Sequence, residues 1–358
     1  MRVVTVIGNR PQFVKAAAVS RLLRAEHEEL LVHTGQHHDD DLSTVFVKEL
    51  GVPRPERELG IHGGTNTEQT ARMLTALGPL LAAERPDAVL VYGDTNSTLA
   101  GGLAAAQAGI PVAHVEAGMR AFDRAMPEEL NRVLTDHLSD VLLCPSETAV
   151  ENLEREHVAG RIDLVGDVMV DVALLFQPRA LADRAPLQRA RVEPGGYVLA
   201  TAHRAGNVDD PGRLRRLVDL LLALPVPVVL PLHPRTRARL EAAGWIEELE
   251  RAPHVRLHPP LGYLDFTALL GHASAVLTDS GGVQKEAYLA GVPCVTLRDT
   301  TEWVETVQLG WNVIVDLDTE AALAALERRP PAERPPLYGD GRAGARVVQA
   351  LSGAPVVH

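Results

Sequence analysis

Groups that can exchange protons stand directly after short apolar runs at several places in the chain. Asp94 follows residues 87–92, Glu116 follows 111–115, and His203 follows 197–201. A carboxylate at the end of a buried run is unfavourable unless it has a partner or a task. Carboxylates and imidazoles are also the usual general acids and bases of enzymes. The pattern therefore indicates acid–base chemistry at the ends of strands.

Each of these groups also has a simpler explanation. Asp94 could cap the helix that follows it, and Glu116 could be paired with Arg120. Glu128 and Glu129 open another helix, where acidic residues complement the helix dipole. We prefer the dipole explanation for Glu129 and keep Glu128 as a site candidate.

Residues 276–287 combine a short strand, a turn with two glycines and a helix. Asp279, Ser280, Gly281 and Gly282 form the turn. The first N–H groups of a helix lack partners and carry partial positive charge, and glycines let a phosphate approach them. Glu286, early in the same helix, is placed to accept a hydrogen bond from a sugar hydroxyl. The alternative is an ordinary turn in which Ser280 only caps the helix.

Positive charge gathers after the first strand, residues 2–7. Gly8 permits a turn, Pro11 suits the first helical position, and Arg10 and Lys15 flank the start of the helix. With the carboxylates, His203 and the Ser-Gly-Gly turn, these cations predict acid–base work on a phosphorylated ligand.

Alternating strand and helix patterns position these groups. Strands are expected near residues 2–7, 29–33, 87–92, 111–115, 140–144, 162–165, 197–201, 226–231, 255–257, 274–278, 293–297 and 312–315. The alternation predicts two doubly wound, Rossmann-like α/β domains with parallel sheets, and a ligand in the crevice between the carboxyl ends of their strands.

The expected domains are residues 1–168, with the carboxylates, and residues 169–340, with the phosphate turn. Residues 341–358 are expected to form a helix that packs back on the N-terminal domain. We expect residues 177–196, rich in Pro, Arg and Ala, to be a mobile surface segment. Residues 328–336 contain four prolines and cannot lie inside a helix.

Composition excludes several classes of protein. The chain has 358 residues, enough for two cores, with 46% apolar and 23% charged residues, and its net charge of −12 argues against nucleic acid as a partner. No stretch is apolar enough to span a membrane. Cys144 and Cys294 lie in separate apolar strands, so no disulfide is expected and a cytoplasmic location fits.

Two motifs are not interpreted as sites. Residues 339–344 match G-x-G-x-x-G, but no strand precedes them, so a dinucleotide site is not expected. Residues 36–41, Gln-His-His-Asp-Asp-Asp, resemble a metal site, yet adjacent histidines point in alternate directions. We predict no metal and no nicotinamide cofactor.

The motifs resemble those of the non-hydrolysing UDP-N-acetylglucosamine 2-epimerases, a family with the two-domain GT-B fold. The likeness runs along nearly the whole chain, and its most specific pieces are Tyr92-Gly-Asp-Thr95, His114-Val-Glu-Ala-Gly118, Pro127-Glu-Glu-Leu-Asn-Arg132 and Leu277-Thr-Asp-Ser-Gly-Gly282. The resemblance implies a cytoplasmic homodimer that acts on a UDP-sugar, with a role in polysaccharide biosynthesis.

The resemblance also implies roles for residues. UDP would bind the second domain through Ser280, Gly281, Gly282, Glu286 and Phe266, with Arg10 reaching from the first domain. The acetamido sugar would face Asp94, Glu116, Glu128 and His203, and Lys15 would help to stabilise departing UDP. The reaction implied is elimination of UDP to a glycal and re-addition of UDP.

Departures from the family pattern leave alternatives open. His203 is followed by Arg204-Ala-Gly-Asn207 where Arg-Arg-Glu-Asn is usual, and Thr300-Thr-Glu-Trp-Val-Glu305 replaces Thr-Thr-Glu-Arg-Pro-Glu. Some motifs, Ile61-His-Gly-Gly-Thr65 among them, look more like the branch that epimerises UDP-2,3-diacetamido-2,3-dideoxyglucuronate. A hydrolysing epimerase or a GT-B glycosyltransferase would share the fold. The loss of the second arginine also predicts that no second UDP-sugar activates the enzyme.

Overall fold

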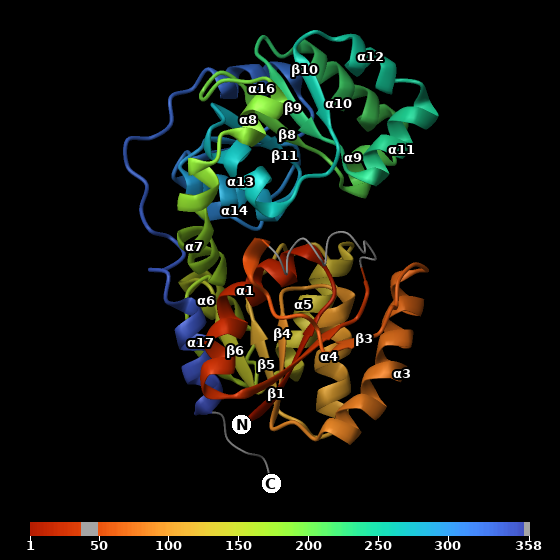
Figure 1. The fold of residues 1–358 in the computed structure, drawn as a ribbon, viewed down its shortest axis with the longest axis vertical. Coiled ribbons are helices and arrows are strands. Elements are labelled where there is room, and N and C mark those ends of the chain that lie inside the picture. Colours follow the sequence, from red (N-terminus) through yellow and green to blue (C-terminus); the bar gives the residue numbers. More distant parts are fainter. Residues whose placement is uncertain (37–48, 354–358) are drawn as a thin grey trace. The chain divides into compact units, whose positions relative to one another are not determined.

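The computed structural model describes residues 1–36 and 49–353 (Figure 1). Its internal contacts divide the chain into two compact units. Unit 1 comprises Met1–Leu175 with Pro336–His358, and unit 2 comprises Phe176–Pro335. Compared with the boundary expected after residue 168, the division falls inside helix α7 (Val168–Ala182).

Unit 1 is built on a parallel sheet with the strand order β3-β2-β1-β4-β5-β6-β7 in the described residues. The strands are β1 (Arg2–Ile7), β2 (Glu28–His33), β3 (Arg57–Glu58), β4 (Ala88–Tyr92), β5 (Val112–Val115), β6 (Val141–Cys144) and β7 (Arg161–Leu164). The helices are α1 (Arg10–Glu26), α3 (Asn66–Glu84), α4 (Asn96–Gln107), α5 (Pro127–Leu138), α6 (Glu147–Arg155), the first part of α7, and α17 (Ala343–Ser352).

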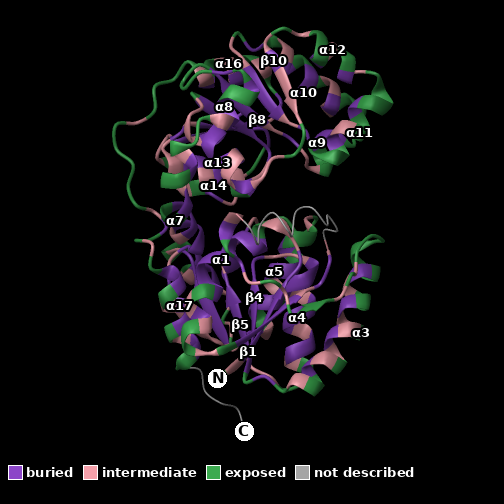
Figure 2. Ribbon diagram, viewed as in Figure 1, coloured by how far each residue is buried: buried purple, intermediate pink, exposed green. Residues whose placement is uncertain are grey.

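The central strands of unit 1 are apolar throughout because both faces of the sheet are covered by helices. Ala88–Tyr92 is buried at every position, and Figure 2 shows the buried residues concentrated on the strands and the inner sides of the helices. Val4 and Val32 pack with Met73 and Leu77 of α3 in one core cluster.

Unit 2 has a second parallel sheet with the order β10-β9-β8-β11-β12-β13. The strands are β8 (Val198–Thr201), β9 (Val228–Pro231), β10 (Val255–His258), β11 (Ala275–Thr278), β12 (Cys294–Thr296) and β13 (Asn312–Ile314). The helices are α8 (Ala185–Ala190), α9 (Ala205–Val208), α10 (Pro211–Ala223), α11 (Pro234–Ala243), α12 (Ile246–Arg251), α13 (Tyr263–Gly271), α14 (Gly281–Ala290), α15 (Val304–Gln308) and α16 (Thr319–Leu326).

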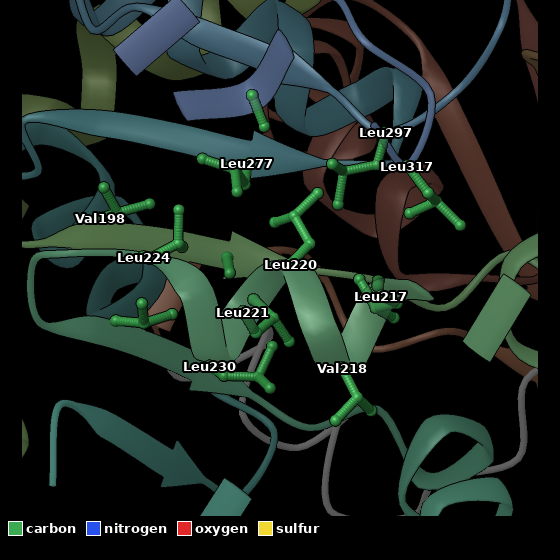
Figure 3. Close-up of a cluster of buried hydrophobic side chains, with 14 of the residues drawn as sticks. Val198, Leu217, Val218, Leu220, Leu221, Leu224, Leu230, Leu277, Leu297 and Leu317 are labelled. Carbon is green, nitrogen blue, oxygen red and sulfur yellow. The ribbon is translucent and has the colours of Figure 1, made fainter. Parts of the chain in front are cut away.

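The core of unit 2 is a leucine-rich layer between helix α10 and the sheet. Leu217 and Leu221 project from α10 toward the strands that carry Leu230 and Leu277, as Figure 3 shows. These side chains are at most 2% exposed, so burial of apolar surface accounts for much of the stability of this unit.

The end of the chain returns to unit 1. The backbone N–H groups of Ala343 and Gly344, at the start of α17, donate to the carboxylate of Asp171. At its other end, Arg161 of β7 donates to the carbonyl oxygens of Ala350 and Gly353. Helix α17 is therefore fixed to this unit at both ends.

One expectation about the chain between the units was wrong. Residues 177–196 are not a mobile surface segment, because they contain the end of α7 and the whole of α8. Leu187 and Ala190 of α8 are buried against Leu269 and Leu270 of α13. The apolar residues between the prolines and arginines were the signal that composition alone obscured.

Among the described residues, no helix has both the length and the apolar character that crossing a membrane requires.

Candidate active site

The polar groups predicted from the sequence lie where each sheet reverses its strand order. In unit 1 the order reverses between β1 and β4, which lead into Arg10 and Asp94. In unit 2 it reverses between β8 and β11, which lead into His203 and Ser280. Open α/β sheets bind ligands at such switch points, outside the carboxyl ends of the strands.

Lys15 and Glu116 form an ion pair at the switch point of unit 1. Lys15 projects from α1, its ammonium group contacts the carboxylate of Glu116, and both side chains are largely buried. Glu116 has a φ of +71°, a left-handed conformation that a non-glycine residue rarely adopts. The chain thus strains its backbone where the Glu116 side chain turns toward Lys15, a feature typical of functional sites.

Asp94 is held by a different cation, Arg132 of helix α5. Arg132 is buried and also donates to Glu129 across 3.0 Å. Asp94 is not the cap of α4, because the side chain of Thr95 caps that helix by accepting from the N–H of Thr98. Asp94 and Glu116 therefore each have their own basic partner.

Our explanation of Glu129 by the helix dipole was incomplete. Glu129 is buried, and its carboxylate accepts hydrogen bonds of 2.9 Å from the backbone N–H groups of Ala121 and Phe122. It thereby ties the loop before α5 to the helix and to Arg132. Glu128 lies exposed in the first turn of α5, and Arg10 lies partly buried in the first turn of α1.

A buried charge network lies beside these pairs. His114 of β5 contacts Asp136 of α5 across 2.7 Å, and Asp136 also accepts from Arg120 across 2.7 Å. Arg120 forms a two-pronged pair with Glu156, so it is not the printed partner of Glu116 that the sequence suggested. Burial opposes ionisation of Asp136, but the charges and hydrogen bonds of His114 and Arg120 outweigh it and lower its pKa.

In unit 2, strand β11 runs through Asp279 and Ser280 into helix α14. Ser280 occupies the N-cap position, but its side chain makes no capping hydrogen bond. The simpler explanation of this serine, as a side-chain cap, is therefore wrong. Ser280 instead donates its own N–H to the hydroxyl of Thr278 across 2.9 Å.

The two glycines of the turn have different surroundings. A Cβ atom at Gly281 would lie 1.9 Å from Oε1 of Glu302, so the protein itself requires glycine there. A Cβ atom at Gly282 would meet only the hydroxyl of Ser280, at 3.9 Å. Gly282 is thus the glycine that leaves open space at the start of α14. The carboxylate of Glu302 is held by Arg298 across 2.8 Å.

Asp279 organises the loop that carries His203. It is fully buried, and its carboxylate accepts from the backbone N–H groups of His203 and Arg204 and from the side-chain amide of Asn207 at 3.0–3.1 Å. The ring of His203 lies 3.4 Å from Asp279 and packs on His233, while 41% of its side chain is exposed. His203 is therefore fixed through its backbone and presents its ring outward.

The remaining predicted residues of unit 2 lie on α13 and α14. Glu286 is partly buried on α14. Phe266 is 9% exposed and packs in a core cluster with Leu269 and Leu270. The unusual Trp303 lies under the ammonium group of Lys285, 4.4 Å from its ring centre, in a cation–π contact.

No cluster of three or more metal-ligating side chains occurs among residues 1–36 and 49–353. The His-Asp motif that we set aside, residues 37–41, lies outside the described residues. The G-x-G-x-x-G match at 339–344 precedes α17 and follows no strand, as its sequence context indicated.

Two Rossmann-type units, one with paired carboxylates and cations and the other with a phosphate-binding type of turn, define a nucleotide-sugar enzyme of the α/β class. A family model described as UDP-N-acetylglucosamine 2-epimerase matches residues 21–352. The chain belongs to this family, and is accordingly an isomerase.

Individual relatives agree with the family assignment. The UDP-2,3-diacetamido-2,3-dideoxy-D-glucuronate 2-epimerase of Pseudomonas aeruginosa is 47% identical, over 98% of this chain and 99% of that protein. The UDP-N-acetylglucosamine 2-epimerase of Methanocaldococcus jannaschii is 39% identical over 98% and 99%. A crystal structure of the M. jannaschii enzyme with UDP-GlcNAc and UDP superposes with a TM-score of 0.92, at 38% identity, covering 98% and 99% of the two chains.

Sequence reasoning missed the residues that hold the candidate groups in place. Arg132, Glu129 and Asp136 are all on α5, and Asp279 is in the turn before α14. The available signal was polar residues on the buried side of a helix. The five buried residues of α5 are all polar: Glu129, Asn131, Arg132, Thr135 and Asp136.

Proposed function

We propose that this enzyme interconverts the C2 epimers UDP-N-acetylglucosamine and UDP-N-acetylmannosamine by eliminating and re-adding UDP. The observation that carries the proposal is the pair of carboxylates at the switch point of unit 1, Asp94 and Glu116, each with its own cation. Inversion at C2 needs proton transfer on both faces of that carbon, and two separately held carboxylates can supply it.

The hydrogen on C2 of the sugar is not acidic, because no carbonyl is attached to that carbon. In the proposed elimination, one carboxylate takes the C2 proton while the C1–O bond breaks. UDP leaves with the bonding electron pair, and a C1=C2 double bond forms in a 2-acetamidoglucal. A proton is then delivered to the opposite face of C2 as an oxygen of UDP attacks C1. The sequence regenerates the enzyme, and no oxidant is consumed.

The surroundings of each group support the assignment of roles. Asp94 and Glu116 are the proton-transfer pair, and Glu128 at the start of α5 assists or orients the sugar. Lys15, paired with Glu116, and Arg10 supply positive charge that stabilises departing UDP. His203, whose ring is exposed beyond Asp279, acts as the acid toward the leaving phosphate.

UDP itself is assigned to unit 2. Ser280, Gly281 and Gly282 would bind the diphosphate through the start of α14, Glu286 would accept from the ribose, and Phe266 would lie near the uracil. The open space at Gly282 and the lack of a side-chain cap from Ser280 support this assignment, because both leave the helix start available to an anion.

A second candidate substrate is UDP-2,3-diacetamido-2,3-dideoxyglucuronate. It is favoured by the 47% identity to the P. aeruginosa enzyme, above the 39% identity to the M. jannaschii UDP-N-acetylglucosamine 2-epimerase. The elimination chemistry is the same for both sugars, so the choice changes the sugar pocket and not the roles of Asp94 and Glu116.

Proton NMR of the purified enzyme in D2O with each UDP-sugar tests the proposal. We expect deuterium at C2 of both epimers without added NAD, and the preferred sugar to show the higher kcat/KM. Products without solvent deuterium would overturn the elimination scheme. Accumulation of UDP with the free manno sugar would instead identify a hydrolysing epimerase.

We also propose that the enzyme is a cytoplasmic homodimer that associates through helix α5. This helix buries its polar side, and its apolar residues Leu130 and Leu134 are 42% and 50% exposed beside Phe122, which is 74% exposed. An exposed apolar face of this kind favours association. Exposed charges of both signs, Asp123, Arg124 and Glu128, surround it, so two copies related by a two-fold axis could pair them.

Light scattering coupled to size exclusion tests the dimer. We expect a dimer for the wild type and a monomer for the double variant Leu130→Asp/Leu134→Asp. Leu164→Asp on β7, an equally exposed leucine outside this face, is the control and should remain a dimer. A monomeric wild type, or a double variant that stays dimeric, would refute association through α5.

A further inference from the structure

His114 is buried completely, and both nitrogen atoms of its ring contact oxygen atoms. Nδ1 lies 2.7 Å from Oδ1 of Asp136, and Nε2 lies 2.7 Å from the carbonyl oxygen of Gly93. The proposed function assigned no task to this residue.

The hydrogen-bond partners determine the protonation state of the ring. The carbonyl oxygen of Gly93 can only accept, so Nε2 must carry a proton. Asp136 has a lowered pKa, chiefly because His114 and Arg120 outweigh the effect of burial, so it is ionised and also only accepts. Nδ1 must then carry a proton as well. A neutral imidazole has one N–H and would leave two lone pairs facing each other across 2.7 Å.

Charges around the ring balance an imidazolium. Asp136 of α5 faces it, Arg120 pairs with Asp136, and Glu156 pairs with Arg120. With His114 charged, these four side chains carry two positive and two negative charges. Nearby, the Lys15–Glu116 pair is neutral by itself. Such contacts of 2.7 Å are typical of charge-assisted hydrogen bonds.

The same contacts connect the two loops that carry the candidate catalytic carboxylates. Through Nε2, His114 holds the carbonyl of Gly93, the residue before Asp94. Asp136, its partner at Nδ1, accepts from the N–H of Gly118, two residues after Glu116, across 3.1 Å. His114 and Asp136 therefore form a bridge from one loop to the other beneath the switch point of unit 1.

We propose that His114 is a permanently protonated positioning residue that fixes Asp94 and Glu116 relative to each other and takes no part in proton transfer. Its charge strengthens both hydrogen bonds of the bridge, and its burial shields it from solvent protons. The assignment of the two carboxylates rests on the proposed function, whereas the protonation state of His114 does not.

NMR of the full-length protein, labelled with 15N in histidine, tests the protonation state without reference to activity. We expect one histidine with two slowly exchanging ring N–H groups that persist from about pH 6 to about pH 9, although an ordinary histidine titrates near 6.5. The signals should disappear in His114→Gln. A wild-type spectrum with no doubly protonated histidine at about pH 9 would overturn the proposal, even if the variant fails to fold.

Kinetics of His114→Gln test the positioning role. The neutral amide can donate to only one of the two acceptors at a time, so kcat should fall about 10–100-fold while KM changes little. The shape of the pH profile of kcat should be retained, since no proton-transfer group is lost. His254→Gln, which loses a single contact to the carbonyl of Leu221 in unit 2, is the matched control.

Three outcomes would contradict this role. Unchanged kcat in a folded His114→Gln variant would exclude positioning, and loss of one limb of the pH profile would make His114 an acid or base. A fall in KM affinity with unchanged kcat would indicate a contact to substrate. If no C2 exchange occurs in the wild type, the proposed function fails, while the NMR result for His114 still stands by itself.

Discussion

The switch points of the two units share one topology but are furnished in opposite ways. In unit 1 the functional atoms belong to side chains: Lys15 pairs with Glu116, and Arg132 with Asp94. In unit 2 they belong largely to the backbone, with the start of α14 uncapped by Ser280 and the His203 loop held by Asp279 through N–H groups.

The helices packed beside the two switch points differ accordingly. Helix α5 of unit 1 buries only polar side chains, whereas α10 of unit 2 buries Leu214, Leu217, Val218, Leu220 and Leu221. Proton transfer needs side chains held in fixed positions, and these require a polar, paired surrounding. Binding a phosphate needs only an open helix start, so the remainder of unit 2 can form an apolar core. One fold therefore supports catalysis in one copy and ligand binding in the other.

The largest effect should follow from removing a carboxylate of unit 1. Asp94→Asn and Glu116→Gln should each lower kcat by about 10²–10⁴-fold, because proton transfer loses one of its two carriers. Steady-state epimerisation, followed by NMR, measures the loss. Asp123→Asn, an exposed acid in the loop before α5, is the control and should keep wild-type kcat. A carboxylate variant with near-normal kcat would remove that residue from the mechanism.

The two glycines of unit 2 should separate folding from binding. Gly281→Ala places a methyl group against Glu302 and should destabilise the protein by about 1–3 kcal/mol, seen as a lower Tm. Gly282→Ala meets no protein atom closer than 3.9 Å and should leave Tm nearly unchanged. It should still weaken UDP about ten-fold, because its methyl group obstructs hydrogen bonds to a charged ligand. Calorimetry that finds full UDP affinity in Gly282→Ala would contradict the phosphate site.

Much of this comparison could be predicted from the sequence. The twelve expected strands are all present, with ends that differ by one or two residues, because apolar runs bounded by turns are a strong signal in a parallel sheet. The expected strands missed only the two-residue β3 of the described chain, Arg57–Glu58, which is exposed and has no apolar pattern. The family likeness also indicated the candidate residues.

The partners of those residues could not be predicted. Arg132 is 38 residues from Asp94, and Asp279 is 76 from His203, so only the fold brings them together. Glu129 was assigned to the helix dipole because its first-turn position explained it without tertiary contacts. Asp94 and Glu116 were assigned a cap and Arg120 for the same reason, since local sequence offers nearby partners first.

The smallest effect is expected from a second UDP-sugar. In the usual family sequence an arginine stands where Ala205 follows Arg204, and this chain lacks its charge-assisted bond, worth about 1.5–3 kcal/mol. Its loss should weaken a second site about ten-fold or more. We expect hyperbolic kinetics and reverse turnover of the manno epimer with none of the gluco epimer added. A sigmoidal curve would mean that other contacts, such as Arg204, maintain that site.

The central claim is that unit 2 binds UDP and unit 1 transfers protons. Titration calorimetry of UDP with Asp94→Asn and Glu286→Ala, each paired with its epimerisation rate, tests this claim most directly. We predict that Asp94→Asn binds UDP with nearly wild-type affinity and has lost epimerisation, whereas Glu286→Ala binds UDP about ten-fold or more weakly, because a charged acceptor for the ribose is gone. Weakened UDP binding in Asp94→Asn with unchanged binding in Glu286→Ala would contradict the division between the two units.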